Sequence, residues 1–471
     1  MQVVLIAAVA AIGGFLFGFD TAVINGAVSA VQAHFHVGPV TLGLSVSGAL
    51  VGAAIGALTA GRLADHFGRV PTMIVAAVLF LVQSFGVGLS FTIVDFTFWR
   101  IVGGVAVGAA SVIAPAYIAE SATAELRGRL GSFQQLAIVV GIFIALLTDF
   151  AIAVAAGGAA RTWLLGLPAW RWMFLSEVIP SLIYLVGALQ IPESPRYLVA
   201  TNRISEARLV LAHIVSAPSV EAKILEIRKT LAKEHRPRFS DLRGRYGLLP
   251  IVWVGIGLSV FQQFVGINVI FYYSSVLWQA VGFSEKQSLE ITVITGLTNI
   301  VTTLVAIATI DRFGRKPLLL IGSFGMAVTL GTMAYLFGTA PLDPAGQPRL
   351  YGASGTIALV AANVYVFFFG MSWGPVVWVL LGEMFPNRIR AAALGLGAAF
   401  QWVANFVVSA TFPTLKSAGL GYAYGLYTLA ALLSFFFVLA LIRETRGREL
   451  ETMTESMRLP GSGAEALQRA R

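Results

Sequence analysis

The sequence predicts an all-α membrane protein in which twelve transmembrane helices form two six-helix halves. Three observations lead to this fold class. First, 57% of the 471 residues are hydrophobic and 12% are charged, a balance too apolar for a soluble chain of this length. Second, twelve apolar runs are long enough to cross about 30 Å of hydrocarbon at about 1.5 Å per residue. Third, loop motifs of the first half recur in the second half.

The twelve apolar runs fall into two groups of six on either side of a polar stretch. The first group lies near residues 3–31, 40–62, 71–91, 96–120, 130–156 and 170–191. The second group lies near residues 248–280, 288–310, 317–339, 354–382, 391–414 and 421–442. The first run lacks a basic start and is too long for a typical signal peptide, so we interpret it as a helix.

This pattern divides the chain into four parts. They are the first six-helix half (1–191), a linker (192–246), the second six-helix half (247–449) and a C-terminal tail (450–471). Apolar residues of the linker recur at amphipathic helical spacing among Glu, Lys and Arg, which predicts short helices rather than a simple tether. The tail is polar and is expected to be disordered.

Basic residues predict the orientation. Of the 32 Lys and Arg residues, 26 lie in the even-numbered loops, the linker and the tail, which share one side of the predicted bundle. The positive-inside rule then predicts a multi-pass protein of the cell membrane with a cytoplasmic linker and both termini cytoplasmic. The Lys and Arg residues at helix ends account for the pI of about 9.9, so we expect no nucleic-acid partner.

Composition restricts the chemistry further. The chain has no cysteine, which excludes disulfides and thiolate metal sites, and its five histidines are scattered. We expect no metal and no other cofactor. No nucleophile or nucleotide-binding loop indicates an enzyme, and the GVAVGAA run at 104–110 is interpreted as small-residue helix packing.

The internal repeat places carboxylates and guanidinium groups at equivalent helix ends. GRLADHFGR at 61–69 recurs as ATIDRFGRK at 308–316. Acidic residues contribute little to orientation, so we predict that they form ion pairs between the halves that close the cytoplasmic side. The alternative for any single basic residue is that it only sets the orientation of its helix in the membrane. The candidate gate residues are Asp65, Arg69, Glu120, Arg127, Glu193, Asp311, Arg315, Glu383, Arg390 and Glu444.

Further motifs are specific to one family. They are GFLFGFDTAVINGA (14–27), WRIVGG (99–104), PAYIAE with RGR (115–129), PESPRYL (192–198), QQFVGINVIFYYS (262–274) and WGPVVWVLLGEMFP (373–386). With the repeated motifs, they make residues 14–449 resemble the sugar porters of the major facilitator superfamily. Two positions depart from the family pattern: Arg443 replaces the proline of its C-terminal PETKG, and His66 stands where it usually has Arg.

Two ionisable residues lie inside predicted helices, where charges are costly and usually functional. Asp20 and Arg100 both fall in the outer half of the membrane, which permits an ion pair that protonation of Asp20 would release. The resemblance implies the same role, since proton-coupled sugar porters carry an Asp at the position of Asp20. The alternative is a static structural pair, and Glu177 is a secondary candidate for the proton.

Neutral amides and aromatic rings suit a sugar, because amides bind hydroxyls and a flat ring covers the apolar face of the pyranose. Such residues recur in the fifth, seventh, tenth and eleventh predicted helices, and Asn405 is one of them. Any single amide is more often a link between helices. The resemblance implies that the sugar-contacting residues are Phe17, Gln135, Gln262, Gln263, Asn268, Asn299, Gly370, Trp373, Gln401 and Trp402.

Tyr272 and Tyr273 follow Gly266, which is expected to break the seventh helix. By resemblance the two tyrosines form an extracellular gate, and the alternative is an aromatic belt at the membrane interface.

The sequence thus predicts a monosaccharide:proton symporter that works by alternating access. Its expected partners are a monosaccharide of the glucose, galactose or xylose class, a proton and membrane lipid, and the protein is expected to be a monomer. The alternatives are a facilitative uniporter of the same fold and a sugar receptor that does not transport, which the short tail after Glu449 disfavours.

Overall fold

The computed structural model describes residues 2–121, 124–212, 219–233, 239–244, 247–342, 348–385 and 389–444, so the predicted tail (450–471) lies outside the described residues. Within these ranges, twelve helical stretches are long and apolar enough to cross a membrane, which is the predicted number. Several helices continue past the apolar runs that predicted them. The span that begins at Pro39 reaches Phe67, because its last turn carries polar residues without leaving the helical conformation.

The first half contains spans one to six. Its elements are α1 (Gln2–Ala22), α2 (Ile24–Phe35), α3 (Pro39–Phe67), α4 (Arg69–Gly88), α5 (Ile93–Ser121), α6 (Ala124–Ala156), the 3-10 turn η1 (Leu164–Gly166), α7 (Ala169–Leu175) and α8 (Val178–Gln190). The second half contains spans seven to twelve. Its elements are α12 (Pro250–Phe264), α13 (Ile267–Ala280), α14 (Glu285–Phe313), α15 (Arg315–Gly338), α16 (Ala353–Met371), α17 (Trp373–Met384), α18 (Arg390–Ala418) and α19 (Leu420–Leu441).

The linker forms short helices, as predicted. They are α9 (Pro195–Ala200), α10 (Ile204–Ala212) and α11 (Val220–Lys233), followed by the 3-10 turn η3 (Phe239–Leu242) and the antiparallel pair β1 (Arg243–Gly244) and β2 (Gly247–Leu248). Ser194 caps α9 by accepting a hydrogen bond from the backbone N–H of Tyr197 at 3.4 Å. Leu198, Leu211 and Ile224 bury the apolar faces of the three helices against one another. The small β-pair was not predicted, since two residues per strand leave no periodic pattern.

Four spans, among those described, are built from two helices each. The first span breaks at Val23 between α1 and α2, the sixth between α7 and α8, and the tenth at Ser372 between α16 and α17. The seventh span breaks at Gly266, whose φ of 84° lies in the left-handed region that favours glycine, as the sequence predicted. Such breaks free backbone groups inside the membrane, and they are tolerated where the segment is buried in protein or lines a cavity.

Small residues let α3 and α5 approach closely. A Cβ added to Gly104 would lie 1.9 Å from the carbonyl oxygen of Ala49, and one added to Gly108 would lie 2.1 Å from that of Ala53. No larger side chain fits at either position without moving a backbone. The GVAVGAA run is therefore a helix-packing surface, as the sequence analysis concluded.

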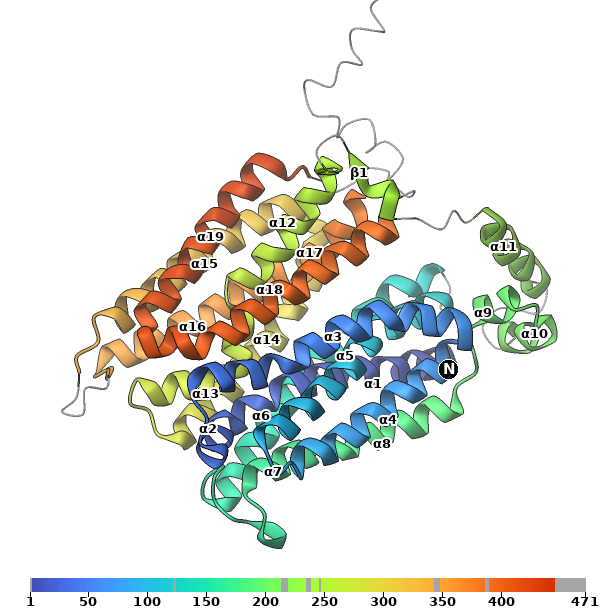
Figure 1. Cartoon of the computed structure of the whole chain (residues 1–471). Helices are drawn as coiled ribbons and strands as arrows, with labels where there is room; N and C mark the ends of the chain where they lie inside the picture. The colour runs from blue at the N-terminus through green and yellow to red at the C-terminus, as the bar shows by residue number, and fades with distance from the viewer. Residues whose placement is uncertain are drawn as a thin grey trace, which may run out of the picture.

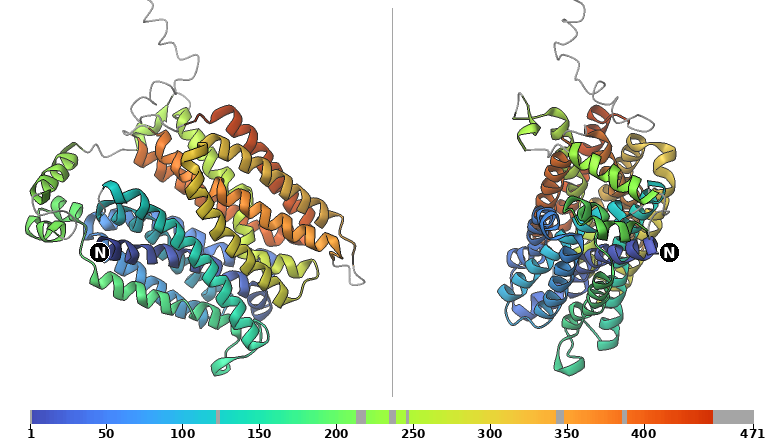
Figure 2. Two further views of the ribbon diagram at one scale, coloured as in Figure 1. Left: turned by 180° about the vertical axis from the view of Figure 1, so that it is seen from behind. Right: turned by 90° about the vertical axis from the view of Figure 1, so that its right-hand side faces the viewer.

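The two halves meet closely at one end, which we call the closed end. There the N–H of Ala159, which follows α6, donates to Glu285 at the start of α14 at 2.8 Å. A Cβ on Gly43 of α3 would lie 2.1 Å from the carbonyl oxygen of Ala410 of α18. Figure 1 and Figure 2 show the ribbons of the two halves close together near α2 and α13 and diverging toward the end that carries α11 and β1. That other end bears the loop motifs at 61–69 and 308–316, and we call it the motif end.

Candidate functional site

A buried cluster of charged and amide side chains lies inside the first half. Arg100 of α5 donates through Nη1 to Oδ1 of Asp20 at 3.0 Å and to the backbone oxygen of Asp20 at 3.1 Å. Asp20 is 0% exposed and Arg100 is 2% exposed, so the ion pair is screened from water. The predicted contact between these two residues is therefore present in the structure.

Gln83 of α4 extends this cluster to a second carboxyl. Its Nε2 donates to Oδ1 of Asp20 at 3.1 Å and to Oε2 of Glu177 at 2.7 Å. Glu177 is fully buried and lies in the break between α7 and α8. One buried cluster thus holds two carboxyls and one guanidinium, and it becomes neutral only when it holds one proton.

Each member reaches the cluster because of where its helix runs. Asp20 lies just before Val23, where α1 ends and α2 follows. A Cβ on Gly103 would lie 2.7 Å from the amide of Gln83, so the absence of a side chain there gives Gln83 the space to reach Asp20. Arg100 also lies 5.9 Å from the ring centre of Phe174, a cation–π contact that helps to hold the guanidinium in the absence of water.

The predicted sugar-contacting amides of the seventh span lie around its break. Gln262 of α12 donates through Nε2 to the carbonyl oxygens of Trp373 at 2.8 Å and Gly374 at 3.1 Å, while its Oε1 is buried without a partner. Asn268 of α13 donates to Oε1 of Gln263 at 2.5 Å across the break. The structure thus joins Gln262 to the tenth span and Asn268 to Gln263, and it leaves Oε1 of Gln262 without a protein donor.

The indole of Trp373 is fixed by the second half. It is fully buried, and its Nε1 donates to Ser323 at 2.9 Å and to the carbonyl oxygen of Leu319 at 3.1 Å. Gly370 packs closely against α14, because a Cβ there would lie 2.2 Å from Oγ1 of Thr302 and 3.7 Å from Oδ1 of Asn299. The indole N–H of Trp373 is occupied by protein acceptors and is not available to a ligand.

Other predicted contacts come from the eleventh, first and fifth spans. The ring centres of Phe17 and Trp402 lie 6.0 Å apart, so an aromatic contact joins α1 of the first half to α18 of the second. Gln401 is partly buried, and its Oε1 is a buried acceptor without a partner in the described protein. Gln135 of α6 is also partly buried. These residues supply the mixture of aromatic faces and free amides that a sugar site requires.

Tyr272 and Tyr273 are buried, at 6% and 1% exposure, in α13, the part of the seventh span that runs toward the closed end. The hydroxyl of Tyr273 donates to the carbonyl oxygen of Ser409 at 2.9 Å, and its ring centre lies 5.1 Å from that of Phe412. Asn405 lies 3.5 Å from the hydroxyl of Tyr272. This burial favours the gate interpretation over an interface belt, whose side chains face lipid headgroups; the gate role itself stays a prediction.

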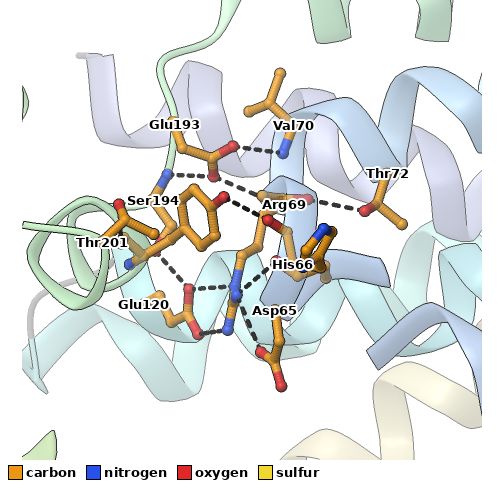
Figure 3. Close-up of polar contacts among 12 residues, drawn as sticks. Asp65, His66, Arg69, Val70, Thr72, Glu120, Glu193, Ser194 and Thr201 are labelled. Atoms are coloured by element: carbon orange, nitrogen blue, oxygen red, sulfur yellow. Dashed lines mark hydrogen bonds and ion pairs between the residues drawn. The ribbon is translucent and has the colours of Figure 1, made fainter. Parts of the chain in front are cut away.

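The candidate gate residues at the motif end form two clusters, each within one half. Arg69 donates through Nε and Nη2 to Glu120 at 3.0 and 2.9 Å, and Asp65 lies 3.2 Å from its Nη1. Glu193 accepts the backbone N–H groups of Arg69 at 3.0 Å and Val70 at 3.2 Å, at the start of α4. Figure 3 shows Glu120, Glu193 and Asp65 gathered around Arg69.

The second half repeats this cluster. Arg315 donates through Nη2 and Nε to Glu383 at 2.7 and 3.1 Å, and Glu444 accepts the backbone N–H groups of Arg315 and Lys316 at 3.0 Å each. The described pairs lie within each half, at an end where the halves diverge. The predicted ion pairs between the halves, which would close this end, stay a prediction. The side chains of Arg127, Asp311 and Arg390 lie outside the described residues.

Three buried polar residues were missed by the sequence analysis. Gln83 bridges the two carboxyls described above. Asn25 joins α2 to α13, and Asp149 of α6 accepts a hydrogen bond from the backbone N–H of Gly26 at 3.1 Å. Asp149 carried a readable signal, because a lone carboxylate within an apolar run is a functional candidate by default. A lone amide carries no such signal.

Comparisons with known proteins agree on one family. The family model described as "Sugar (and other) transporter" matches residues 6–457. The glucose transport protein of Synechocystis sp. is 62% identical over 454 residues, which cover 96% of this chain and 97% of that protein. The D-xylose-proton symporter of Escherichia coli K12 is 38% identical over 479 residues, which cover 94% of each. The inward-open structure of the xylose transporter XylE from E. coli superposes with a TM-score of 0.83 at 36% identity, covering 96% of this chain and 99% of that one.

Proposed function

This chain belongs to the sugar (and other) transporter family, and from that premise we propose that it carries a monosaccharide and a proton together across a cell membrane by alternating access. The observation that carries the proposal is the Asp20–Arg100 ion pair, closed to water inside the first half. The predicted major facilitator fold is confirmed, and the family consists of transporters rather than enzymes. The relatives named above transport glucose or xylose, which supports a hexose or a pentose as the substrate.

The coupling step that we propose starts at Asp20. Protonation removes its charge and weakens the hydrogen bond from Arg100, which is strong because both groups are ionised. Arg100 then loses its fixed position between α1 and α5. Glu177 is a second proton acceptor of the same cluster, because Gln83 contacts both carboxyls. Protonation thereby changes which arrangement of α1, α4 and α7 is stable. Through this change, a proton gradient drives movement of the sugar.

The sugar in this proposal lies between the halves, near the breaks of the seventh and tenth spans. Gln262 and Gln401 offer buried acceptors without protein partners, and a sugar hydroxyl is a donor that would satisfy them. Phe17 and Trp402 supply aromatic faces from opposite halves. The proposed sugar-binding set is Phe17, Gln135, Gln262, Gln263, Asn268, Asn299, Gly370, Trp373, Gln401 and Trp402.

The motif end is the cytoplasmic end in this proposal, as the distribution of Lys and Arg favours. The closed end then faces outward, and Tyr272 and Tyr273 belong to its gate. The TM-score of 0.83 with an inward-open relative supports this assignment. We further propose that the Arg69 and Arg315 clusters stabilise the helix ends of their own halves, and that the protein works as a monomer.

The experiment that tests the proposal is uptake of labelled glucose and labelled xylose into proteoliposomes, with and without an inward proton gradient. We expect gradient-driven accumulation of at least one of the sugars in the wild type and exchange without accumulation in Asp20→Asn. Asp95→Asn is a matched control, because Asp95 lies on the same helix as Arg100 but in an exposed turn, and it should behave as the wild type.

Equilibration of sugar without accumulation in the wild type would instead make the protein a uniporter. Accumulation that persists in Asp20→Asn would show that Asp20 is not the binding site of the coupled proton. Binding of sugar without flux would favour the receptor alternative.

A further inference from the structure

Asp149 is a buried carboxyl that the proposed coupling mechanism does not use. It is 0% exposed near the closed end of α6. Its Oδ2 accepts the backbone N–H of Gly26 at 3.1 Å, and its Oδ1 is buried without a partner. A Cβ on Gly26 would lie 2.6 Å from the Cβ of Asp149, so the two residues are in close contact and leave no room for another group between them.

No cation faces this carboxyl in the described part of the chain. Charged side chains on the elements packed against α6 have contacts elsewhere. Arg100 of α5 pairs with Asp20 of α1. Arg171 of α7 donates to the carbonyl oxygens of Gly88 and Ser90 and lies beside His34 of α2. On α14, Glu285 accepts from Ala159 and Lys286 pairs with Glu290. A carboxylate with one amide donor and no cation is strongly disfavoured in such a place, and the group takes a proton instead.

The location of Asp149 connects it to the contact between the halves. Gly26 follows Asn25 in the first turn of α2, directly after the break at Val23. Asn25 donates to the carbonyl oxygen of Phe271 at 2.9 Å and to Ser274 at 3.1 Å. It also accepts the N–H of Ser275 at 3.0 Å, and the hydroxyl of Ser275 donates to its backbone oxygen. Asp149 therefore holds the turn that attaches the first half to α13 of the second.

The same region contains a second inter-half contact of α6. A Cβ on Gly296 of α14 would lie 3.1 Å from the side chain of Leu146, one turn of α6 before Asp149. Opening of the closed end separates α2 from α13 and α6 from α14, and both contacts lie within one turn of Asp149. Water then reaches a carboxyl that is dry in the closed arrangement.

We propose that Asp149 is a second proton-binding site, protonated while the closed end is shut and ionised when that end opens, so that acid favours the closed arrangement. The proton comes from water at the closed end, forms an O–H bond at Oδ1, and returns to the same water on opening. Oδ2 remains free to accept from Gly26. This proton does not cross the membrane, unlike the one proposed for Asp20. The inference rests on alternating access, and it adds a control of the closed end by pH.

The test uses the absence of cysteine in the chain. Val28→Cys places one thiol on α2 in a small cavity at the closed end that Tyr273 and Phe412 also line, and the residue is fully buried. Ser417→Cys, at an exposed position of the same cavity, gives the intrinsic pH dependence of the thiol reaction. The labelling rate with a polar maleimide is measured on the purified full chain in nanodiscs, and the Val28→Cys rate is divided by the Ser417→Cys rate.

Linkage to one proton changes this ratio by at most about tenfold per pH unit, so we expect a decrease of about tenfold or more from pH ~7.5 to pH ~5.5. In Asp149→Asn the ratio should be low and independent of pH, because the amide keeps the acceptor for Gly26 without a charge. In Asp20→Asn the pH dependence should persist.

A wild-type ratio that does not change with pH overturns the inference, and so does full pH dependence in Asp149→Asn. If Asp149→Asn does not give monodisperse protein, the wild type and Asp20→Asn are compared instead. Loss of the pH dependence of the labelling ratio in Asp20→Asn would assign that dependence to Asp20 and overturn the inference. The labelling requires neither sugar nor flux. Failure of gradient-driven uptake would therefore count against the proposed function and leave this inference standing.

Discussion

The two halves share their helix-end clusters and differ inside the membrane. At the motif end, Arg69 with Glu120 is matched by Arg315 with Glu383. Within the membrane, the first half buries charged groups such as Asp20, Arg100, Glu177 and Asp149. Among the described residues of the second-half spans, the buried polar side chains are neutral except for Arg315, which lies at a helix end. The comparison indicates that the repeat preserves the helix-end clusters, while the buried charged groups within the membrane are confined, among the described residues, to the first half.

The largest expected effect tests the charged interior of the first half. Arg100→Gln leaves Asp20 without its cation, and breaking a buried ion pair from one side costs about 3–5 kcal/mol of the free energy of unfolding. We expect a large fall in the Tm of the detergent-solubilised protein. The double variant Asp20→Asn with Arg100→Gln removes both charges and should recover most of that Tm without recovering accumulation. A single variant as stable as the wild type would show that the pair is not electrostatically isolated.

The next effect tests the neutral interior of the second half. Gln401→Leu removes a buried acceptor that no described protein donor uses, so the fold loses little while the sugar loses one hydrogen bond. Such a bond contributes about 0.5–1.5 kcal/mol, which corresponds to a rise in KM of roughly two- to tenfold. The pH profile of uptake should not change. A shifted pH profile in this variant would show that an amide of the second half also affects proton binding.

The helix-end clusters are expected to affect stability in a similar way in the two halves. Glu120→Gln and Glu383→Gln each remove the charge from a two-point contact with an arginine, a type of bond that contributes about 1.5–3 kcal/mol when shielded from water. The side chain of Glu120 is 13% exposed and that of Glu383 is 28% exposed, so Glu120→Gln should lower the Tm more. A larger loss from Glu383→Gln would mean that the two clusters are not equivalent.

Sequence reasoning predicted the fold well, because membrane helices are determined by apolar length and the repeat by loop motifs. It also placed Asp20 beside Arg100, since helix rise alone fixes their depth. It did not specify the ion pairs within each half at the motif end, because sequence spacing does not state whether two repeats contact each other or themselves; the pairs between the halves stay a prediction. Gln83 was missed for a similar reason: an amide in an apolar run becomes informative only when its neighbours in space are known.

The smallest effect is expected in the linker, which separates surface ion pairs from buried ones. Arg208 of α10 and Glu221 of α11 form an exposed pair at 2.5 Å, and the hydrogen bond from Arg208 holds the pKa of Glu221 below its ordinary value. A carboxyl with a lowered pKa in the folded state contributes stability above its unfolded pKa, and this contribution disappears as the pH falls through the folded value. At neutral pH the pair is nevertheless screened by solvent. Glu221→Gln should therefore leave the Tm unchanged within error at pH ~7, and no difference from the wild type should appear as the pH falls, because the contribution of the pair only decreases. A measurable fall in Tm at neutral pH would show that the contact between α10 and α11 depends on this pair more than on the apolar residues beneath it.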